Sequence, residues 1–175
     1  MFDWLLRLLP GRPRYRFSEE VDTPAIHLAR SAYDGLMQCL APARDARHEG
    51  VALLLGRANG CKISVLQSVQ PRARTSRGSF EIPAREMARV VSLAMDLDLQ
   101  IVGQVHTHPG QAYHSEGDEE GANIRYDGYV SIVIPDYGAH LPGRAGWAVY
   151  HFSDTRGWVA LPDNAVAIVE GTAAL

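Results

Sequence analysis

Apolar residues recur at helical spacing in two parts of the chain. In the first, an Asp-Thr-Pro sequence at residues 22–24 supplies a capping side chain and a first-turn proline, both typical of a helix start. The apolar positions that follow at helical spacing are Ile26, Ala29, Tyr33, Leu36, Met37 and Leu40. Pro42 and the charged residues after it predict the end of this helix. A second helix is expected from Pro83 to about Leu97. Its core-facing stripe is Met87, Val90, Val91, Ala94 and Met95.

Continuous apolar runs predict buried strands around these helices. Residues 50–56 and 61–69 are expected to form a hairpin, joined by a turn in which Gly60 supplies the unusual backbone angle. The other predicted strands are 79–82, 99–105, 129–134, 146–152 and 157–161. A short helix is expected over residues 115–124. The last residues are expected to form a loose tail or a short final helix.

This order of elements predicts an α/β sandwich in which a mixed β-sheet is flanked by helices. Residues 22–175 are expected to form a single domain, because this length suits one hydrophobic core and no linker or repeat interrupts it. Residues 1–21 are an apolar and then basic leader, too short in its apolar part to span a membrane and unlike a signal peptide in its charge order. Two interpretations of its apolar face stay open: packing on the domain itself, or docking to a partner protein.

Composition is that of an ordinary soluble globular protein, with 46% hydrophobic and 21% charged residues. The formal net charge of -3 argues against general binding to nucleic acid or to an anionic membrane. Cys39 and Cys61 are widely spaced, and neither belongs to a Cys-x-x-Cys pair. Both are interpreted as buried thiols, and a reducing cytoplasm is the expected compartment.

Candidate chemistry is concentrated in residues 105–118, which read VHTHPGQAYHSEGD. In an extended strand end, side chains two positions apart point to the same side, so His106 and His108 can converge on one ion. Asp118 can return from the next element as a third ligand, and His and carboxylate groups are usual zinc ligands. Ser115, three residues before Asp118, is in position to cap a helix there.

A simpler interpretation applies to each of these histidines alone, since a single histidine is more often a surface or core residue than a ligand. Such His-x-His pairs also arise by chance in a chain with seven histidines. The combination favours a metal site: an apolar strand delivers His-x-His-Pro, and a glycine-containing turn and Ser-x-x-Asp follow.

This stretch resembles the JAMM motif of the MPN, or JAB, metalloprotease family. That motif consists of a distant glutamate, then His-Ser/Thr-His-Pro, a short spacer and Ser-x-x-Asp. Glu49 heads an apolar strand seven residues before Gly56, which is similar to the family's Glu-x₆-Gly signature. The resemblance implies an MPN (cytidine-deaminase-like) sandwich in which His106, His108 and Asp118 hold zinc. It also implies Glu49 as the general base and Ser115 as an oxyanion donor.

One departure from the family pattern concerns the spacer between Pro109 and Ser115. It has five residues in this chain, where six are usual, so the loop is tighter by one residue. Glu116 and Glu119 are the alternative third ligands if the tighter loop displaces Asp118.

The resemblance implies a zinc-dependent peptidase or isopeptidase that cuts after the C-terminal glycine of a ubiquitin-like protein. In form the chain is similar to small bacterial JAB peptidases found with ubiquitin-like conjugation systems, including those of antiviral defence. The partners implied are the ubiquitin-like protein or its conjugates and the E1/E2-like proteins of the same system. Two alternatives stay open: a non-catalytic MPN scaffold in a protein complex, and a zinc hydrolase that acts on a sulfur-carrier adduct.

The loop of residues 71–78 carries three arginines. Its simplest interpretation is a solvated loop. The functional interpretation is that Arg72, Arg74 or Arg77 guides a substrate tail or its carboxylates, because arginine binds carboxylate through two parallel hydrogen bonds.

Overall fold

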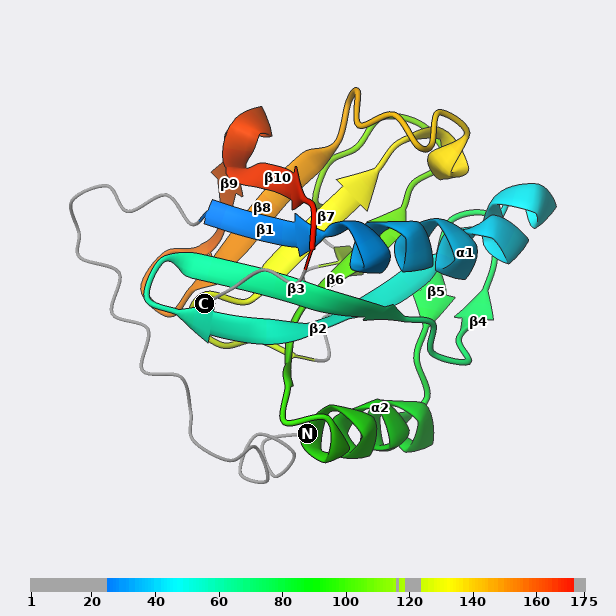
Figure 1. Ribbon diagram of the computed structural model, residues 1–175. Coiled ribbons are helices and arrows are strands. Elements are labelled where there is room, and N and C mark those ends of the chain that lie inside the picture. The colour runs from blue at the N-terminus through cyan, green and yellow to red at the C-terminus, as the bar shows by residue number, and fades with distance from the viewer. Residues whose placement is uncertain (1–24, 116, 119–123, 172–175) are drawn as a thin grey trace.

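The structure is a computed structural model that describes residues 25–115, 117–118 and 124–171. An eight-stranded mixed sheet forms its centre, with strand order β10-β1-β3-β2-β6-β7-β8-β9 (Figure 1). The strands of this sheet are β1 Ala25–Ala29, β2 Val51–Asn59, β3 Lys62–Val69, β6 Gln100–Thr107, β7 Val130–Ile134, β8 Ala148–Ser153, β9 Gly157–Leu161 and β10 Val166–Val169. The predicted α/β architecture with a mixed sheet is therefore confirmed.

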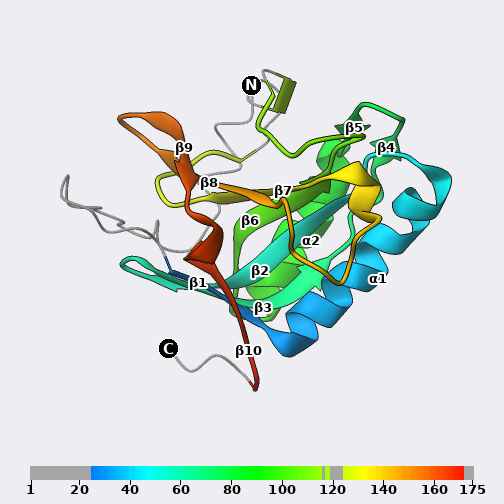
Figure 2. The same cartoon turned by 90° about the horizontal axis from the view of Figure 1, so that it is seen from above.

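Two α-helices, the short 3₁₀ helices Asp136–Gly138 and Asp163–Ala165, and a small hairpin complete the described fold. Helix α1 is Arg30–Ala46 and helix α2 is Ala84–Asp96. The hairpin pairs β4, Arg74–Thr75, with β5, Phe80–Glu81. Figure 2 shows α1 running alongside the sheet, with the hairpin near the end of that helix. No described helix is both long enough and apolar enough to cross a membrane.

The two faces of the sheet carry separate hydrophobic cores. Side chains of β2 alternate between them: Ala52 and Leu54 join the core that contains α1, and Val51, Leu53 and Leu55 join the core that contains α2. This is the arrangement that a strand buried on both faces requires, and it explains the unbroken apolar run. Gly56 follows at a register shift, where a Cβ atom would lie 2.0 Å from the Ser64 carbonyl oxygen.

The prediction of a helix start at residues 22–24 was wrong within the described chain. Residues 25–29 are strand β1, in which Ile26 and Leu28 are buried in alternation, and the helix begins only at Arg30. The strand pairs in parallel with both β3 and β10. These long-range partners supply the hydrogen bonds that override a locally helical pattern. Residues 1–24 lie outside the described residues, so the division into a leader and a domain stays a prediction.

Three further expectations are corrected. Pro42 does not end the first helix, which continues to Ala46 and packs Ala43 into the core. The chain end contains strand β10, which pairs with β1, in place of a loose tail or helix. Met95 is 49% exposed and so does not belong to the buried stripe of α2. Cys39 and Cys61 form no disulfide, as expected, but both are only partly buried.

Candidate metal centre

The candidate site lies where the end of β6 meets the start of β2. These strands are antiparallel, and their register pairs His106 with Val51. The backbone is locked just beyond this pair, because Thr107 N–H donates to the Gly50 carbonyl and Gly50 N–H donates to the Thr107 hydroxyl. Side chains on one face of a sheet recur every two residues, so this register brings Glu49 beside His106 and His108.

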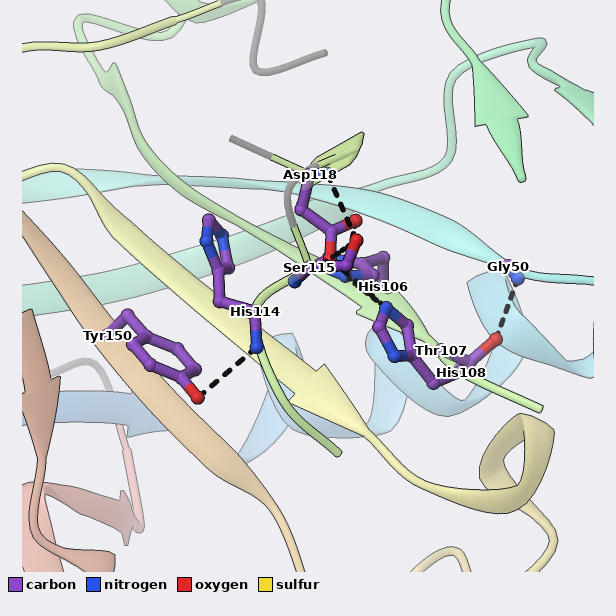
Figure 3. Close-up of polar contacts among 8 residues, drawn as sticks. All are labelled: Gly50, His106, Thr107, His108, His114, Ser115, Asp118 and Tyr150. Carbon is purple, nitrogen blue, oxygen red and sulfur yellow. Dashed lines mark hydrogen bonds and ion pairs between the residues drawn. The ribbon is translucent and has the colours of Figure 1, made fainter. Parts of the chain in front are cut away.

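Figure 3 shows His106, His108, Ser115 and Asp118 converging on one point. The Nε2 atoms of the two histidines are 3.2 Å apart. Asp118 places Oδ1 3.2 Å from His106 Nε2 and Oδ2 3.2 Å from His108 Nε2. The tighter loop therefore still delivers Asp118 to the two histidines. The alternative ligands Glu116 and Glu119 lie outside the described residues.

The geometry of these donors fits a small divalent metal. Ligand atoms of the three residues all lie within 4.8 Å of one another. Around a tetrahedral zinc ion with ligands at about 2.0–2.1 Å, neighbouring ligand atoms are roughly 3.3 Å apart, close to the separations found here. Two imidazoles and one carboxylate also form a catalytic type of zinc ligand set, which leaves a fourth position for water.

Ser115 and Asp118 cap the turn that carries them. Ser115 N–H and its hydroxyl donate to Asp118 Oδ2 at 2.8 and 2.7 Å, and Asp118 N–H lies 3.2 Å from the Ser115 hydroxyl oxygen. This reciprocal pattern is the capping arrangement that Ser-x-x-Asp predicts. Because the Ser115 hydroxyl hydrogen is directed at Asp118, the role of Ser115 as an oxyanion donor stays a prediction.

The two carboxylates of the site, Asp118 and Glu49, have very different pKa values. Burial opposes the charged form of Asp118, but hydrogen bonds from His106 and His108 outweigh it and hold the pKa of Asp118 well below its usual range. Burial raises the pKa of Glu49 to about 7; the nearby His108 opposes this rise and Asp118 adds to it. One carboxylate is thus a permanent anion, whereas the other is poised to exchange a proton near neutral pH.

A cavity of about 260 Å³ connects these groups to solvent. Its lining includes Glu49, His108, Ser115 and Asp118, with Phe80 of the hairpin on the wall. Aromatic rings flank the two histidines: Phe80 lies 5.3 Å from His106, and the exposed Tyr113 meets His108 edge-on at 5.0 Å, both between ring centroids. The sequence analysis assigned no role to either aromatic residue, although Tyr113 lies in residues 108–115, the loop that joins His108 to Ser115 and is called the motif loop below.

Comparison with models of known protein families shows to which family the chain belongs. The family model for prokaryotic homologues of the JAB domain matches residues 39–150, which include Glu49 and the whole motif.

The chain belongs to the prokaryotic JAB family.

Two relatives extend this assignment. A probable metalloprotease of Sinorhizobium fredii is 28% identical over 145 residues, which cover 81% of this chain and 90% of that protein. The solution structure of a protein from Desulfitobacterium hafniense superposes with a TM-score of 0.64 at 20% identity. The superposed region covers 85% of this chain and 95% of the Desulfitobacterium hafniense chain. The first relative supports the resemblance found in the sequence, and the second supports the fold.

His114 is a residue of this JAB-family site that sequence reasoning left without a role. Its backbone N–H donates to the Tyr150 hydroxyl at 3.2 Å (Figure 3). Its ring packs on those of Tyr150 and Trp158, with centroids 5.0 and 4.5 Å away. Burial lowers the pKa of His114 to about 4, so its imidazole is neutral at neutral pH. Its position inside the motif loop, directly before Ser115, was the available signal.

Tyr137 connects the motif loop to the hairpin through two hydrogen bonds. Its backbone N–H donates to the His108 carbonyl at 2.7 Å, and its hydroxyl donates to the Arg77 carbonyl at 2.8 Å. Glu49 N–H donates to the Ser76 carbonyl at 2.7 Å and holds the same hairpin from the other side. Tyr137 adopts a left-handed conformation with φ of 55°, which is unusual for a large side chain and costs about 1–3 kcal/mol.

We expect Tyr137→Phe to loosen the hairpin without changing metal binding, because it removes only the hydroxyl that holds the Arg77 carbonyl. The stability loss should be about 1 kcal/mol. Hydrogen exchange of the peptide 74–82 should become faster. Tyr126→Phe is the matched control, since the Tyr126 hydroxyl donates to the Ile101 carbonyl at 2.9 Å, away from the hairpin. Equal exchange of the hairpin in both variants would contradict the role of Tyr137.

The arginine loop is partly explained by local contacts. Arg74 forms an exposed ion pair with Glu81 across the hairpin at 3.3 Å, and Arg72 N–H donates to the Glu86 carboxylate. An exposed pair of this kind contributes little stability. Recognition of a substrate tail by Arg72, Arg74 or Arg77 stays a prediction.

Proposed function

We propose that this JAB-family chain is a zinc-dependent peptidase or isopeptidase that cuts after the C-terminus of a ubiquitin-like protein. One observation carries the catalytic part of the proposal: the buried carboxylate of Glu49 shares an open cavity with His108 and Asp118. Membership of the family and the likeness to a probable metalloprotease support metal-dependent hydrolysis. The ligand spacing near 3.2 Å supports zinc as the metal.

The residues divide the chemistry between them. His106, His108 and Asp118 would hold the metal, which would act as a Lewis acid and lower the pKa of bound water toward ~7. Glu49 takes a proton from the attacking water and returns it to the departing amine, which its pKa of about 7 suits. Ser115, on the cavity wall, donates its hydroxyl to the oxygen that gains negative charge once that hydroxyl turns away from Asp118.

The residues that line the cavity support a substrate with small residues at the scissile bond. Gly78 and Gly117 contribute no side chain to its lining, whereas Phe80 and Tyr113 form aromatic walls. A chain end of small residues such as glycine would lie between these aromatic side chains more readily than one with bulky side chains. This property, with the family membership, supports the C-terminus of a ubiquitin-like protein as the substrate segment.

We place the enzyme in the cytoplasm, in a bacterial ubiquitin-like conjugation system whose E1/E2-like proteins are further partners. Antiviral defence is the proposed setting. The acidic net charge is the property of this chain that bears on partners, since it disfavours nucleic acid and anionic membranes.

A cleavage panel tests this function. The purified protein, loaded with zinc, is incubated with ubiquitin-like proteins joined through their terminal glycine to a reporter, either by a peptide bond or by a lysine isopeptide bond. Mass spectrometry should find cleavage directly after that glycine, abolished by EDTA and in Glu49→Gln. A sulfur-carrier protein with a small C-terminal adduct forms a third arm.

The outcomes separate the candidate functions. Cleavage of the sulfur-carrier adduct alone would identify a sulfur-carrier protein, and not a ubiquitin-like conjugate, as the substrate. A zinc-loaded protein that cleaves no member of the panel would contradict the proposal and favour a non-catalytic scaffold.

A further inference from the structure

Several buried polar atoms lie on the same face of the sheet as the candidate metal ligand His106. Within the described chain, His106 Nδ1, both ring nitrogens of His114 and the Ser131 hydroxyl are buried without a hydrogen-bond partner. Native proteins rarely leave such atoms unpaired, because each one costs about 1–3 kcal/mol. A group of them on one face of the sheet therefore indicates a bound polar molecule.

Strand register places these atoms on the same face of the sheet. Ser131 of β7 lies between Gln104 of β6 and Tyr150 of β8. His106 follows Gln104 by two residues and so shares its face. His114 covers this region from the motif loop, with its backbone bonded to the Tyr150 hydroxyl and its ring centroid 6.4 Å from that of His106.

The Nδ1–H group of a metal-bound His106 requires a hydrogen-bond acceptor. Its Nε2 faces His108 and Asp118, so a metal would be bound through that nitrogen. Binding through Nε2 leaves the proton on Nδ1, which then must donate a hydrogen bond from a fully buried position. Metal-bound histidines almost always donate this second N–H, which fixes the ring and strengthens the ligand.

His114 is in position to satisfy that demand through one water. With centroids 6.4 Å apart, the ring nitrogens come no nearer than about 4 Å, too far for a direct hydrogen bond but within the span of a single bridging water. A neutral imidazole offers one acceptor and one donor. Ser131 adds a third polar group, and a buried water typically makes two to four hydrogen bonds.

We propose that His114 is a positioning residue for the metal ligand His106, acting through a buried water that accepts from His106 Nδ1 and bonds to His114 and the Ser131 hydroxyl. The Tyr150 and Trp158 rings fix the His114 imidazole in place. Loss of such a partner of a ligand lowers metal affinity by about 10–100-fold. The inference rests on the metal site of the proposed function but not on its substrate.

The test compares zinc affinity in three variants by competition with a chromogenic chelator. His114→Phe keeps an aromatic ring against Trp158 and removes both nitrogens, whereas His114→Gln keeps an acceptor. His151→Phe is the control for loss of a buried imidazole elsewhere, since the His151 side chain belongs to β8 and is also buried. We expect zinc binding about 10–100-fold weaker in His114→Phe, and within a few-fold of wild type in His114→Gln and His151→Phe.

Two further measurements distinguish a hydrogen bond from a packing role. The thermal midpoint of metal-free His114→Phe should stay close to that of wild type, because phenylalanine keeps an aromatic ring against Tyr150 and Trp158. In zinc-loaded wild-type protein, ¹H–¹⁵N spectra of the imidazoles should show His106 Nδ1–H protected from exchange, and this reading does not depend on any variant folding.

Equal zinc affinity of His114→Phe and wild type would overturn the proposal, as would equal weakening in His114→Phe and His114→Gln or an unprotected His106 Nδ1–H. Wild-type protein that binds no zinc would instead overturn the metal centre itself. Failure to cleave any substrate would leave this inference intact.

Discussion

Replacing Glu49 with glutamine is expected to lower kcat by about two to four orders of magnitude while the protein keeps its metal. Glutamine has nearly the same shape as glutamate but can neither accept nor return a proton at neutral pH. Glu49 is 6% exposed, and no metal ligand is removed with it. The measurement is kcat on a cleaved substrate beside metal content by atomic emission.

Glu86→Gln is the matched control for this experiment. Glu86 is also 6% exposed, but its carboxylate accepts from Arg89 at 2.9 Å, which lowers the pKa of Glu86. This variant should lose stability, because it weakens a charge-assisted hydrogen bond, and should keep kcat near wild type. A Glu49→Gln enzyme with kcat close to that of wild type would assign the proton transfer to another group.

Asp118→Ala is expected to weaken zinc binding by more than about a hundred-fold, because loss of a supporting partner alone already costs about 10–100-fold. It also leaves His106 and His108 without the carboxylate that both contact at 3.2 Å. Activity should disappear together with the metal. Metal content after dialysis and circular dichroism of the same sample separate loss of zinc from loss of fold.

Glu119→Ala and Glu116→Ala test the alternative created by the short spacer. Both variants should retain zinc as wild type does. The reverse result, with zinc lost in Glu119→Ala and kept in Asp118→Ala, would move the third ligand to the acidic run. Asp136→Ala, which removes an exposed aspartate paired with His140, controls for a change of charge near the motif loop.

The grouping of the candidate metal ligands could be predicted because these residues lie close together in the chain. His106 and His108 lie on the same side of the strand because side chains alternate with a period of two residues. Asp118 lies three residues after Ser115, and the capping hydrogen bonds between these two residues hold it in place. Buried strands were predictable for a similar reason, since β2 is covered on both faces and reads as one apolar run.

Long-range pairing accounts for most of what the sequence left open. Strand β1 has an apolar pattern that also fits a helix, and only pairing with β3 and β10 selects the extended form. The environment of His114 likewise depends on β8 and β9, which supply Tyr150 and Trp158 from distant parts of the chain.

The sequence by itself therefore determined which residues are the candidate metal ligands and, through the family resemblance, predicted metallopeptidase chemistry for them. The position of Glu49 beside them was decided by the antiparallel register of β2 and β6. The same tertiary packing decided the rise of its pKa to about 7 and the enclosure of His106 and His114. Local patterns report which face of an element is apolar, but hydrogen-bond register and desolvation arise only when distant segments pack together.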